Sequence, residues 1–469
     1  MEDVQKDTIV NDVEALTDAD RALYSLTTML DDVAPQTRMT SGQTIKAQTL
    51  INVSDIIAEE YSDVAGYDNA FYLVTLENEN GVASTAFLGA TPNLPSVIAI
   101  INGVEYTIED CCEACAEIFG YEYIAADDTI TRSSLGTGTP GLIVPPIVPP
   151  ISTIIGTPSV PWDPGTPSDP DPEVPLPDIP TDPGNFTATS ETHYRIITKV
   201  DPLMKSHFHQ GWPFNEKNEF KDDSKTERYA AGCVVIAIAQ IMTYNKLVKG
   251  EGIDNWKNKN IEWNHIASAV EKQHQKYQTS YLNISKNEMG ENKYSDEEIE
   301  ALAAFIDLIA DEVVTEYADD GTSSTISRAK SFFSDIGFVN VDKQSYDLDK
   351  IRIMIMDKEL PVYIRGMCSD SNCSSGHAWV VDGWYQREKV EITTLYRNGN
   401  PVSATTTVLG IEKYLHYNWG WSTGQDGYYA DGVFDTMNVF LSTSVGVRNN
   451  PMDHNYDNSV KILTYDSAL

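Results

Sequence analysis

A cysteine at the head of an apolar helix is the residue in this sequence best suited to nucleophilic chemistry. Cys233 follows Gly232 and precedes Val234 to Tyr244, a run without proline or glycine in which apolar residues recur at helical spacing. The free N–H groups and the dipole of a helix N-terminus favour a thiolate and lower the pKa of a thiol. A free cysteine is also a common small core residue. Cys233 is therefore a candidate nucleophile only if the chain also supplies a base, an orienting group and an oxyanion donor.

Three further stretches contain groups of these kinds. Gln210 lies in a turn-rich loop ahead of the helix, and its amide can donate to an oxyanion together with the N–H of Cys233. His377 stands at the start of a predicted strand and is the candidate base, although one histidine near a strand can equally be a buried structural residue. On the next strand, Asn418 can accept from an imidazole N–H, and Trp419 can shield that bond from water.

The other cysteines do not form a recognisable metal site. Three of them fall in one stretch that opens a predicted helix with Asp110 as its cap: Cys111, Cys112 and Cys115. No fourth Cys or His lies nearby in sequence, so the usual zinc set is incomplete and a structural or free-thiol role is favoured. Cys368 and Cys373 are close enough in sequence to bridge a loop. We therefore expect no metal and no cofactor.

Composition excludes some classes of function. The chain has 469 residues, enough for two or three domains, and its net charge of −37 argues against a nucleic-acid partner. No apolar run is long enough to span a bilayer. Residues 1–10 lack the basic start and apolar core of a signal peptide, so we expect either a cytoplasmic protein or a form whose leader has been removed.

The sequence divides into three parts. Residues 1–130 read as a small α+β unit, with helices after Thr17-Asp18 and Ser54-Asp55 and strands within 70–90 and 96–108. Residues 131–190 form a linker, because fifteen of the 23 prolines fall between Pro140 and Pro183, where neither a helix nor a central strand can form. Residues 191–469 form the domain that carries the candidate site.

This last domain combines helices with a sheet. After the Cys233 helix, a capping box of Ser295 and Glu298 opens a long amphipathic helix, and a second helix follows over 327–336. Small residues between these two helices, 318–325, predict a loop. Apolar runs at 360–367, 377–385, 414–421 and 427–431 then predict strands of a curved antiparallel sheet. The predicted fold class is therefore α+β.

The motifs in combination resemble the streptopain family of papain-like cysteine peptidases. The resemblance covers most of Lys199 to Leu469 and rests on QGWPFN, GCVVIAIAQIMTY, PVYIRG, GHAWVVDGW and YNWGWSTGQDGYY. It implies a papain-like domain, protein or peptide substrates, and a secreted or cell-surface bacterial endopeptidase made as a zymogen. The N-terminal unit resembles the family's inhibitory prodomain more weakly, through NAFYLVTLENENGVASTAFL.

The resemblance also implies roles and leaves alternatives. Cys233 would be the nucleophile, His377 its paired acid and Gln210 an oxyanion donor, while Asn418 or Trp419 would orient the imidazole. Removal of the prodomain would cut the chain within 185–200. The long linker and the bulky residues after Gly-Cys-Val depart from the family pattern. An amidase or transferase acting on a non-protein amide, and an inactive binding module, are the other classes this sequence allows.

Overall fold

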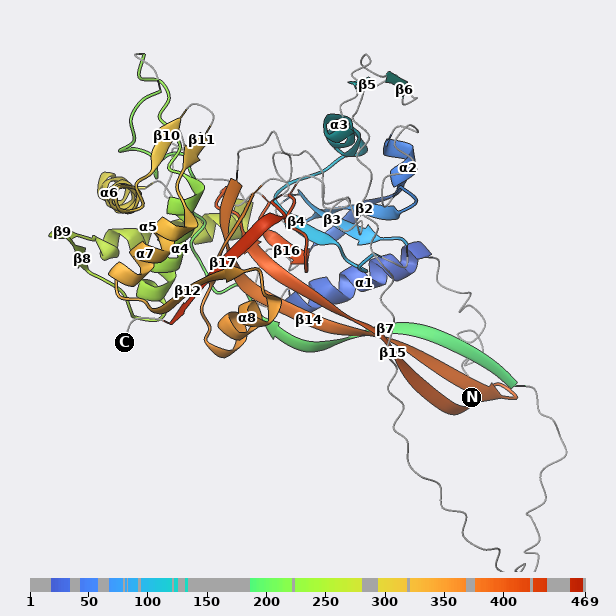
Figure 1. Cartoon of the computed structure of the whole chain (residues 1–469). Helices are drawn as coiled ribbons and strands as arrows, with labels where there is room; N and C mark the ends of the chain where they lie inside the picture. The colour runs from blue at the N-terminus through green and yellow to red at the C-terminus, as the bar shows by residue number, and fades with distance from the viewer. Residues whose placement is uncertain are drawn as a thin grey trace, which may run out of the picture.

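The computed structural model shows an α+β protein built around one large antiparallel sheet, as predicted (Figure 1). Helices α4 to α7 gather at one end of the molecule, and α1 lies near the N-terminal strands. The structure describes these residues: 18–33, 43–57, 67–78, 81, 83–91, 94–119, 122–124, 131–133, 186–221, 224–280, 294–318, 321–367, 376–421, 425–436 and 456–466.

The N-terminal unit and the C-terminal domain share the same eleven-stranded sheet. From one edge to the other, ten strands follow in the order β1 (Thr44–Asn52), β2 (Ala70–Glu77), β3 (Ala83–Gly89), β4 (Ala99–Asn102), β16 (Gly427–Ala430), β15 (Asn400–Asn418), β14 (Gly376–Arg397), β13 (Val362–Met367), β17 (Asn458–Asp466) and β12 (Val339–Ser345). The eleventh strand, β7 (Phe186–Val200), pairs with β14. The junction between the two parts is the pairing of β4 with β16.

The remaining elements are helices and three short hairpins. The helices are α1 (Asp18–Val33), α2 (Val53–Ile56), α3 (Ile108–Phe119), α4 (Cys233–Leu247), α5 (Trp263–Ser280), α6 (Asp296–Glu312), α7 (Ile326–Asp335), α8 (Leu348–Arg352) and a π-helical turn, Ile353–Asp357. The hairpins are β5 (Glu122–Ile124) with β6 (Thr131–Ser133), β8 (Asn255–Trp256) with β9 (Lys259–Asn260), and β10 (Glu316–Ala318) with β11 (Gly321–Ser323). No helix in these described stretches is both long and apolar enough to cross a membrane.

Most predicted elements are confirmed, with local differences. The capping box at Ser295 is present at the start of α6. The stretch predicted as a loop between α6 and α7 contains the hairpin β10–β11. The helix predicted after Ser54-Asp55 ends at Ile56, because Ile57 has extended angles (φ −104°, ψ 139°); its continuation from residue 58 lies outside the described residues.

Helix α3 begins earlier than its sequence suggested. Thr107 is the residue before the helix: its Oγ1 accepts from the N–H of Asp110, and the carboxylate of Asp110 accepts from the N–H of Thr107 at 2.6 Å. This reciprocal pair is a capping box, so Asp110 is its third helical residue and not the cap. The three cysteines of the helix are buried in the core, and burial raises the pKa of Cys111. Cys368 and Cys373 lie outside the described residues.

The predicted linker ends earlier than expected. Strand β7 starts at Phe186 and pairs with β14 along its whole length, from Phe186 opposite Arg397 to Val200 opposite Trp384. The boundary predicted at 190 therefore falls inside a strand, and the last residues assigned to the linker belong to the sheet. Residues 134–185 lie outside the described part of the chain.

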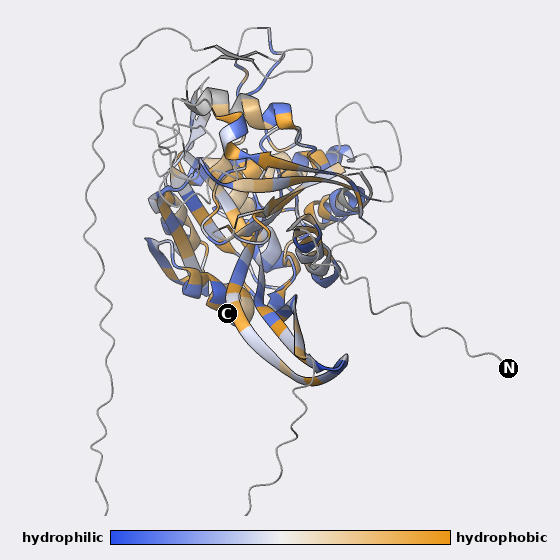
Figure 2. Cartoon of the chain, turned by 90° about the vertical axis from the view of Figure 1, so that its right-hand side faces the viewer, coloured by the Kyte–Doolittle hydropathy of each residue, from blue (hydrophilic) through white to orange (hydrophobic). Residues whose placement is uncertain are grey.

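Strands β14 and β15 are much longer than predicted, with 22 and 19 residues. They are joined by a tight turn in which Asn398 (φ +52°) and Gly399 (φ +79°) take the left-handed conformation of an Asn-Gly hairpin. Together with β7, residues 386–412 project from the body as a three-stranded ribbon, here called the arm (Figure 1). Figure 2 shows hydrophilic and hydrophobic residues mixed along it, unlike a strand with one buried face.

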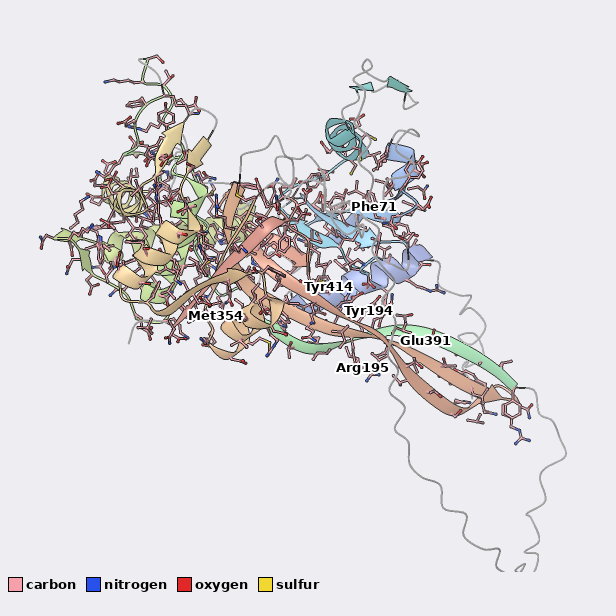
Figure 3. All side chains as sticks on the ribbon, viewed as in Figure 1. Phe71, Tyr194, Arg195, Met354, Glu391 and Tyr414 are labelled. Carbon is pink, nitrogen blue, oxygen red and sulfur yellow. The ribbon has the colours of Figure 1, made fainter. Side chains whose placement is uncertain are left out.

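A buried arginine at the base of the arm binds the N-terminal unit. Arg387 on β14 is fully buried, and its guanidinium donates to the carbonyl and hydroxyl oxygens of Ser25 in α1 at 2.9 and 2.7 Å. It also donates to Glu412 at 2.8 Å and lies 4.1 Å from the ring of Tyr194. Tyr194 and Tyr414, another ring in this cluster, are labelled in Figure 3. A buried charge is tolerated only with such a complete set of partners.

We expect Arg387→Ala to lower the free energy of unfolding by about 3–5 kcal/mol, because it leaves the Glu412 carboxylate buried without its charge partner. Arg195→Ala is the matched control, since Arg195 makes only an exposed 3.4 Å pair with Glu388 and such pairs contribute about 0–1 kcal/mol. Chemical denaturation of the full chain measures both. Equal effects of the two substitutions would contradict the role given to Arg387.

Candidate active site

Cys233 is the first residue of α4, as predicted. Helix α4 is buried from Val234 to Asn245, which explains an apolar run without a polar face. Gly232 caps the helix with φ +95°, and a Cβ there would lie 2.8 Å from Cγ2 of Thr322 in β11. Glycine is therefore required at this turn. Cys233 itself is free and partly exposed at the end of a rigid, buried helix.

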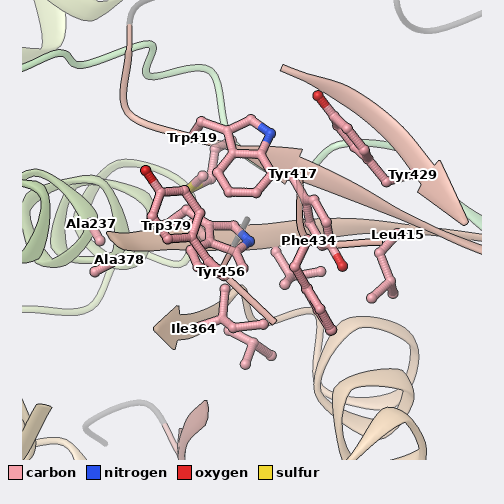
Figure 4. Packing of buried hydrophobic residues seen from close by; sticks show 14 of the residues in the cluster. Ala237, Ile364, Ala378, Trp379, Leu415, Tyr417, Trp419, Tyr429, Phe434 and Tyr456 are labelled. Atoms are coloured by element: carbon pink, nitrogen blue, oxygen red, sulfur yellow. The ribbon is translucent and has the colours of Figure 1, made fainter. Parts of the chain in front are cut away.

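The thiol lies beside the strand that carries His377. Cys233 is close enough to the main-chain N–H of Ala378 for that group to influence its pKa, and Ala378 directly follows His377 at the start of β14. Figure 4 shows Ala237 of α4 next to Ala378 of β14, where helix and strand pack together. Two small residues allow this close approach, so the structure brings the predicted nucleophile and base to the same corner of the fold.

The pKa of Cys233 departs from the sequence prediction. Burial raises the pKa of the thiol, while the N–H of Ala378 and the charge of Arg365 act in the opposite direction without fully offsetting it. Helix position alone predicted a lowered pKa, but desolvation is the larger effect in this form of the chain. Arg365 on β13 lies opposite Ala378 in the sheet, and sequence reasoning did not single it out.

His377 is buried within a cluster of aromatic rings. Its ring centroid lies 4.4 Å from that of Trp421, 5.2 Å from Tyr456 and 5.9 Å from Trp419. Figure 4 shows Trp379, Trp419 and Tyr456 grouped together. These rings keep bulk water from the imidazole, the shielding that the sequence assigned to Trp419 alone.

The hydrogen bond that orients His377 comes from the main chain. Nε2 of His377 lies 2.8 Å from the carbonyl oxygen of Trp419. A carbonyl can only accept, so Nε2 carries the proton and Nδ1 is left as the basic nitrogen of the neutral ring. The acceptor is thus provided by Trp419 through its backbone, which fixes the tautomer.

The prediction that the side chain of Asn418 accepts a hydrogen bond directly from His377 is wrong. Oδ1 of Asn418 accepts from Nε2 of Gln240 at 3.0 Å and from the N–H of Gly420 at 3.2 Å, and Nδ2 donates to the carbonyl of Ser206. The N–H of Gly420 and the carbonyl of Trp419 belong to one peptide group. Asn418 therefore holds the peptide that His377 binds, and through Gln240 it also holds α4.

Gln210 is positioned next to the turn that leads into α4. The main-chain carbonyl of Gln210 accepts from the N–H of Ala231 at 2.8 Å, and Ala231 lies two residues before Cys233. A groove of about 500 Å³ opens beside it. The groove is lined by Gln210, Trp212, Asn215, Phe220, Arg228 and Ala230, among others.

Several residues of the site were missed in the sequence, for different reasons. Trp421 and Gln240 stand inside motifs that had already been noticed, and each carries a recognisable polar or aromatic group. Tyr456 is separated from every motif, so no local pattern could have found it. Asp426, discussed below, stands in the stretch QDGYY, where an acid before a strand reads as a surface turn.

Residues 208–429 match the family model described as the Peptidase C10 family. This match confirms the predicted resemblance to the streptopain family and supports a cysteine peptidase. The match includes Gln210, Cys233, His377 and the Asn418-Trp419 pair.

More distant comparisons add little. A solved fragment of prointerpain A from Prevotella intermedia is similar with a TM-score of 0.41 and 13% sequence identity, over 84% of this chain and 94% of that one. No curated protein matches the chain. The roles of individual residues are therefore argued from the geometry above.

Because the acceptor for His377 is a backbone carbonyl, we expect Trp419→Phe to keep the pH dependence of Cys233 alkylation while lowering stability by about 1–3 kcal/mol, since a buried indole becomes smaller. Asn418→Ala removes the acceptor of the Gly420 N–H and should shift that pH dependence. The rate of reaction with iodoacetamide, followed at the Cys233 peptide by mass spectrometry from pH 4 to pH 10, measures both. A shifted pH dependence in Trp419→Phe but not in Asn418→Ala would show that the indole, and not the peptide between Trp419 and Gly420, orients the imidazole of His377.

Proposed function

We propose that this protein is a cysteine endopeptidase in which Cys233 and His377 form the catalytic pair. The observation that carries the proposal is the placement of a partly exposed thiol on a buried helix, beside a histidine whose tautomer is fixed by the carbonyl of Trp419. The family of residues 208–429 supports the same reaction class. The substrates are proteins or peptides.

The reaction follows from the roles of these groups. Nδ1 of His377 takes the proton of the Cys233 thiol, and the thiolate sulfur attacks the scissile carbonyl carbon. The backbone N–H of Cys233 and the amide of Gln210 donate to the oxyanion that forms. His377 then protonates the leaving amine, and a water molecule activated by the same ring hydrolyses the thioester and restores the thiol.

The groove beside Gln210 is the proposed binding site for part of the substrate chain. It combines the apolar rings of Trp212 and Phe220 with the guanidinium of Arg228, which lies 3.9 Å from the ring centre of Phe220. Such a mixture suits a peptide that presents an apolar side chain together with a carbonyl or a carboxylate.

We further propose that the N-terminal unit is an inhibitory prodomain of a secreted or cell-surface enzyme. Its support is a fitted interface. Gly427 of β16 lies so close to β4 that a Cβ would stand 2.0 Å from the carbonyl oxygen of Ile100. Tyr106 donates to the carbonyl of Thr436 at 2.7 Å, and Arg387 binds Ser25.

The activation site moves with the observed boundary. The window first predicted, residues 185–200, coincides with β7, whose backbone is hydrogen-bonded to β14 throughout. A protease binds its substrate as an extended chain outside any sheet, so β7 is a poor cleavage site. We now place the cut between 134 and 185, ahead of Phe186.

Replacing Cys233 by Ala should abolish hydrolysis of casein by the activated enzyme and labelling by a thiol-directed epoxide. Cys115→Ala is the control, because this fully buried thiol in α3 lies in the N-terminal unit and should affect neither readout. A Cys233→Ala protein that still cleaves casein would refute the proposed nucleophile.

Cutting the chain between 134 and 185 should leave its two parts associated, because the pairing of β4 with β16 and the bonds of Arg387 to Ser25 do not depend on the linker. We expect the freshly cut fragments to elute together in size-exclusion chromatography, with peptidase activity rising as the N-terminal fragment is lost. N-terminal sequencing of the active species locates the cut. Full activity of the uncut chain, or an active form that begins inside β7, would contradict this scheme.

A further inference from the structure

A buried acid behind the active site holds the main chain of Trp419. Asp426 lies just before β16, is 1% exposed, and its Oδ1 accepts from the N–H of Trp419 at 2.9 Å. The carbonyl of the same Trp419 accepts from Nε2 of His377 at 2.8 Å. One side of Trp419 is thus fixed by Asp426 and the other side is bound by the candidate base.

Asp426 and its neighbours restrain different peptides of the segment around Trp419. Gly420 turns the chain with φ +72°, and a Cβ there would stand 2.9 Å from Cγ2 of Ile236, so the turn is closed tightly over α4. Asn418 holds the peptide after Trp419 through the N–H of Gly420. The peptide before Trp419 is held by Asp426. Both peptides must stay in place for the carbonyl to point at His377.

The surroundings of Asp426 keep its carboxyl in the low-dielectric interior. Its second oxygen, Oδ2, lies 3.7 Å from Nδ1 of His207 in the loop before α4, beyond hydrogen-bond distance. His416 of β15, Asp382 of β14 and Tyr429 of β16 are the other titratable groups whose charges act on it. Burial is the largest influence and raises the pKa of Asp426 to about 8. Its Oδ1 can accept from the N–H of Trp419 in either protonation state.

The N-terminal unit reaches the same residue from the other side. Asn102, at the end of β4, donates to the carbonyl of Asp426 through both its N–H and its Nδ2, each at 3.1 Å. The N–H of Gln425 returns a bond to the carbonyl of Asn102 at 3.3 Å. Asp426 is thus bonded by its main chain to the N-terminal unit and by its side chain to the loop that orients His377.

We propose that Asp426 is a positioning residue for His377, acting through the Trp419 main chain, in the reaction proposed above. The inference rests on that proposed function, because it needs the Cys233–His377 pair. In this proposal Asp426 does not contact the substrate. It keeps the Trp419 carbonyl directed at Nε2 of His377, so that the ring holds the tautomer whose Nδ1 is basic.

The test compares two substitutions of similar shape. Asp426→Asn keeps an oxygen that can accept from the Trp419 N–H, whereas Asp426→Leu fills the same space without an acceptor. Asp431→Asn is the matched control, since Asp431 lies five residues along and the one side-chain hydrogen bond described for it is accepted from the hydroxyl of Tyr346. The readout is the rate of iodoacetamide alkylation of Cys233 in the full chain against pH, together with casein hydrolysis after activation.

We expect Asp426→Leu to lower both rates about 10–100-fold at neutral pH, the usual cost of losing a partner that orients a functional histidine, and to shift the acid limb of the alkylation profile. Asp426→Asn should follow the wild-type profile below pH 8 and depart from it only above, where the wild-type residue gains its charge. Asp431→Asn should match wild type. If Asp426→Leu does not fold, as judged by thermal denaturation, the profile of Asp426→Asn decides.

Several results would overturn the proposal. A wild-type profile for folded Asp426→Leu would show that the carboxyl does not position His377, and so would an Asp426→Asn profile that matches wild type at every pH. These outcomes can be distinguished from failure of the proposed function. If the proposed function is wrong, the activated wild-type protein does not cleave casein in a Cys233-dependent way. If only the role of Asp426 is wrong, the wild-type protein does so, and only the Asp426 variants differ from expectation.

Discussion

The hydrogen bond from Nε2 of His377 to the carbonyl of Trp419 is the contact around which this site is arranged. A side-chain acceptor can rotate, but a backbone carbonyl points correctly only if the peptides on both sides are fixed. The positive φ of Gly420, the amide of Asn418 and the carboxyl of Asp426 supply this restraint. Asn418 also receives a bond from Gln240 in α4, so one polar group locks the nucleophile helix to the loop that orients the base.

The same loop leads directly into the strand that receives the N-terminal unit. Two residues of the chain, Gln425 and Asp426, are bonded to Asn102, and β16 then pairs with β4. The N-terminal unit is therefore an extension of the catalytic sheet, with its edge placed beside the segment that sets His377. A domain that pairs at a sheet edge can be removed easily, because losing this pairing does not rearrange the other strands of the sheet. The close fit at Gly427 leaves no room for a side chain at this point of the pairing.

The sequence predicted those parts of the fold that local patterns determine. The apolar run after Cys233, the capping box at Ser295 and the short strands of the sheet all follow from spacing within a dozen residues. The arm was missed because its strands have no buried residue beyond Val390, so Thr-rich stretches such as 403–408 show no alternation that would indicate a strand. The pairing of β7 with β14 joins segments about two hundred residues apart, which no local pattern records.

The candidate residues of the site could be chosen from the sequence, but the hydrogen bonds between them could not. Gln210, Cys233 and His377 were chosen for their side chains, and the structure brings Cys233 and His377 to one corner with Gln210 beside them. Asn418 was chosen because its amide can accept from an imidazole. Every residue has a carbonyl, however, so sequence cannot indicate which carbonyl will face a histidine. Only the fold shows that the acceptor belongs to Trp419 and that Asn418 acts one step behind it.

The position of the arm separates the covalent connection between the two parts from the place where they pack together. The chain re-enters the described structure at Phe186, at the tip of the arm, far from the junction of β4 with β16 (Figure 1). A cut ahead of Phe186 therefore leaves all 15 residues of β7 in the sheet. In the proposed scheme, the uncut chain would keep the N-terminal unit at a high effective concentration beside β16, so that a transient opening of the β4 edge closes again. After the cut, dissociation would depend on the contacts between the two parts, which include those of β4 with β16, Arg387 with Ser25 and Tyr106 with Thr436. The covalent connection would then set how long the two parts stay together, while Arg387 and Asn102 fix how they fit.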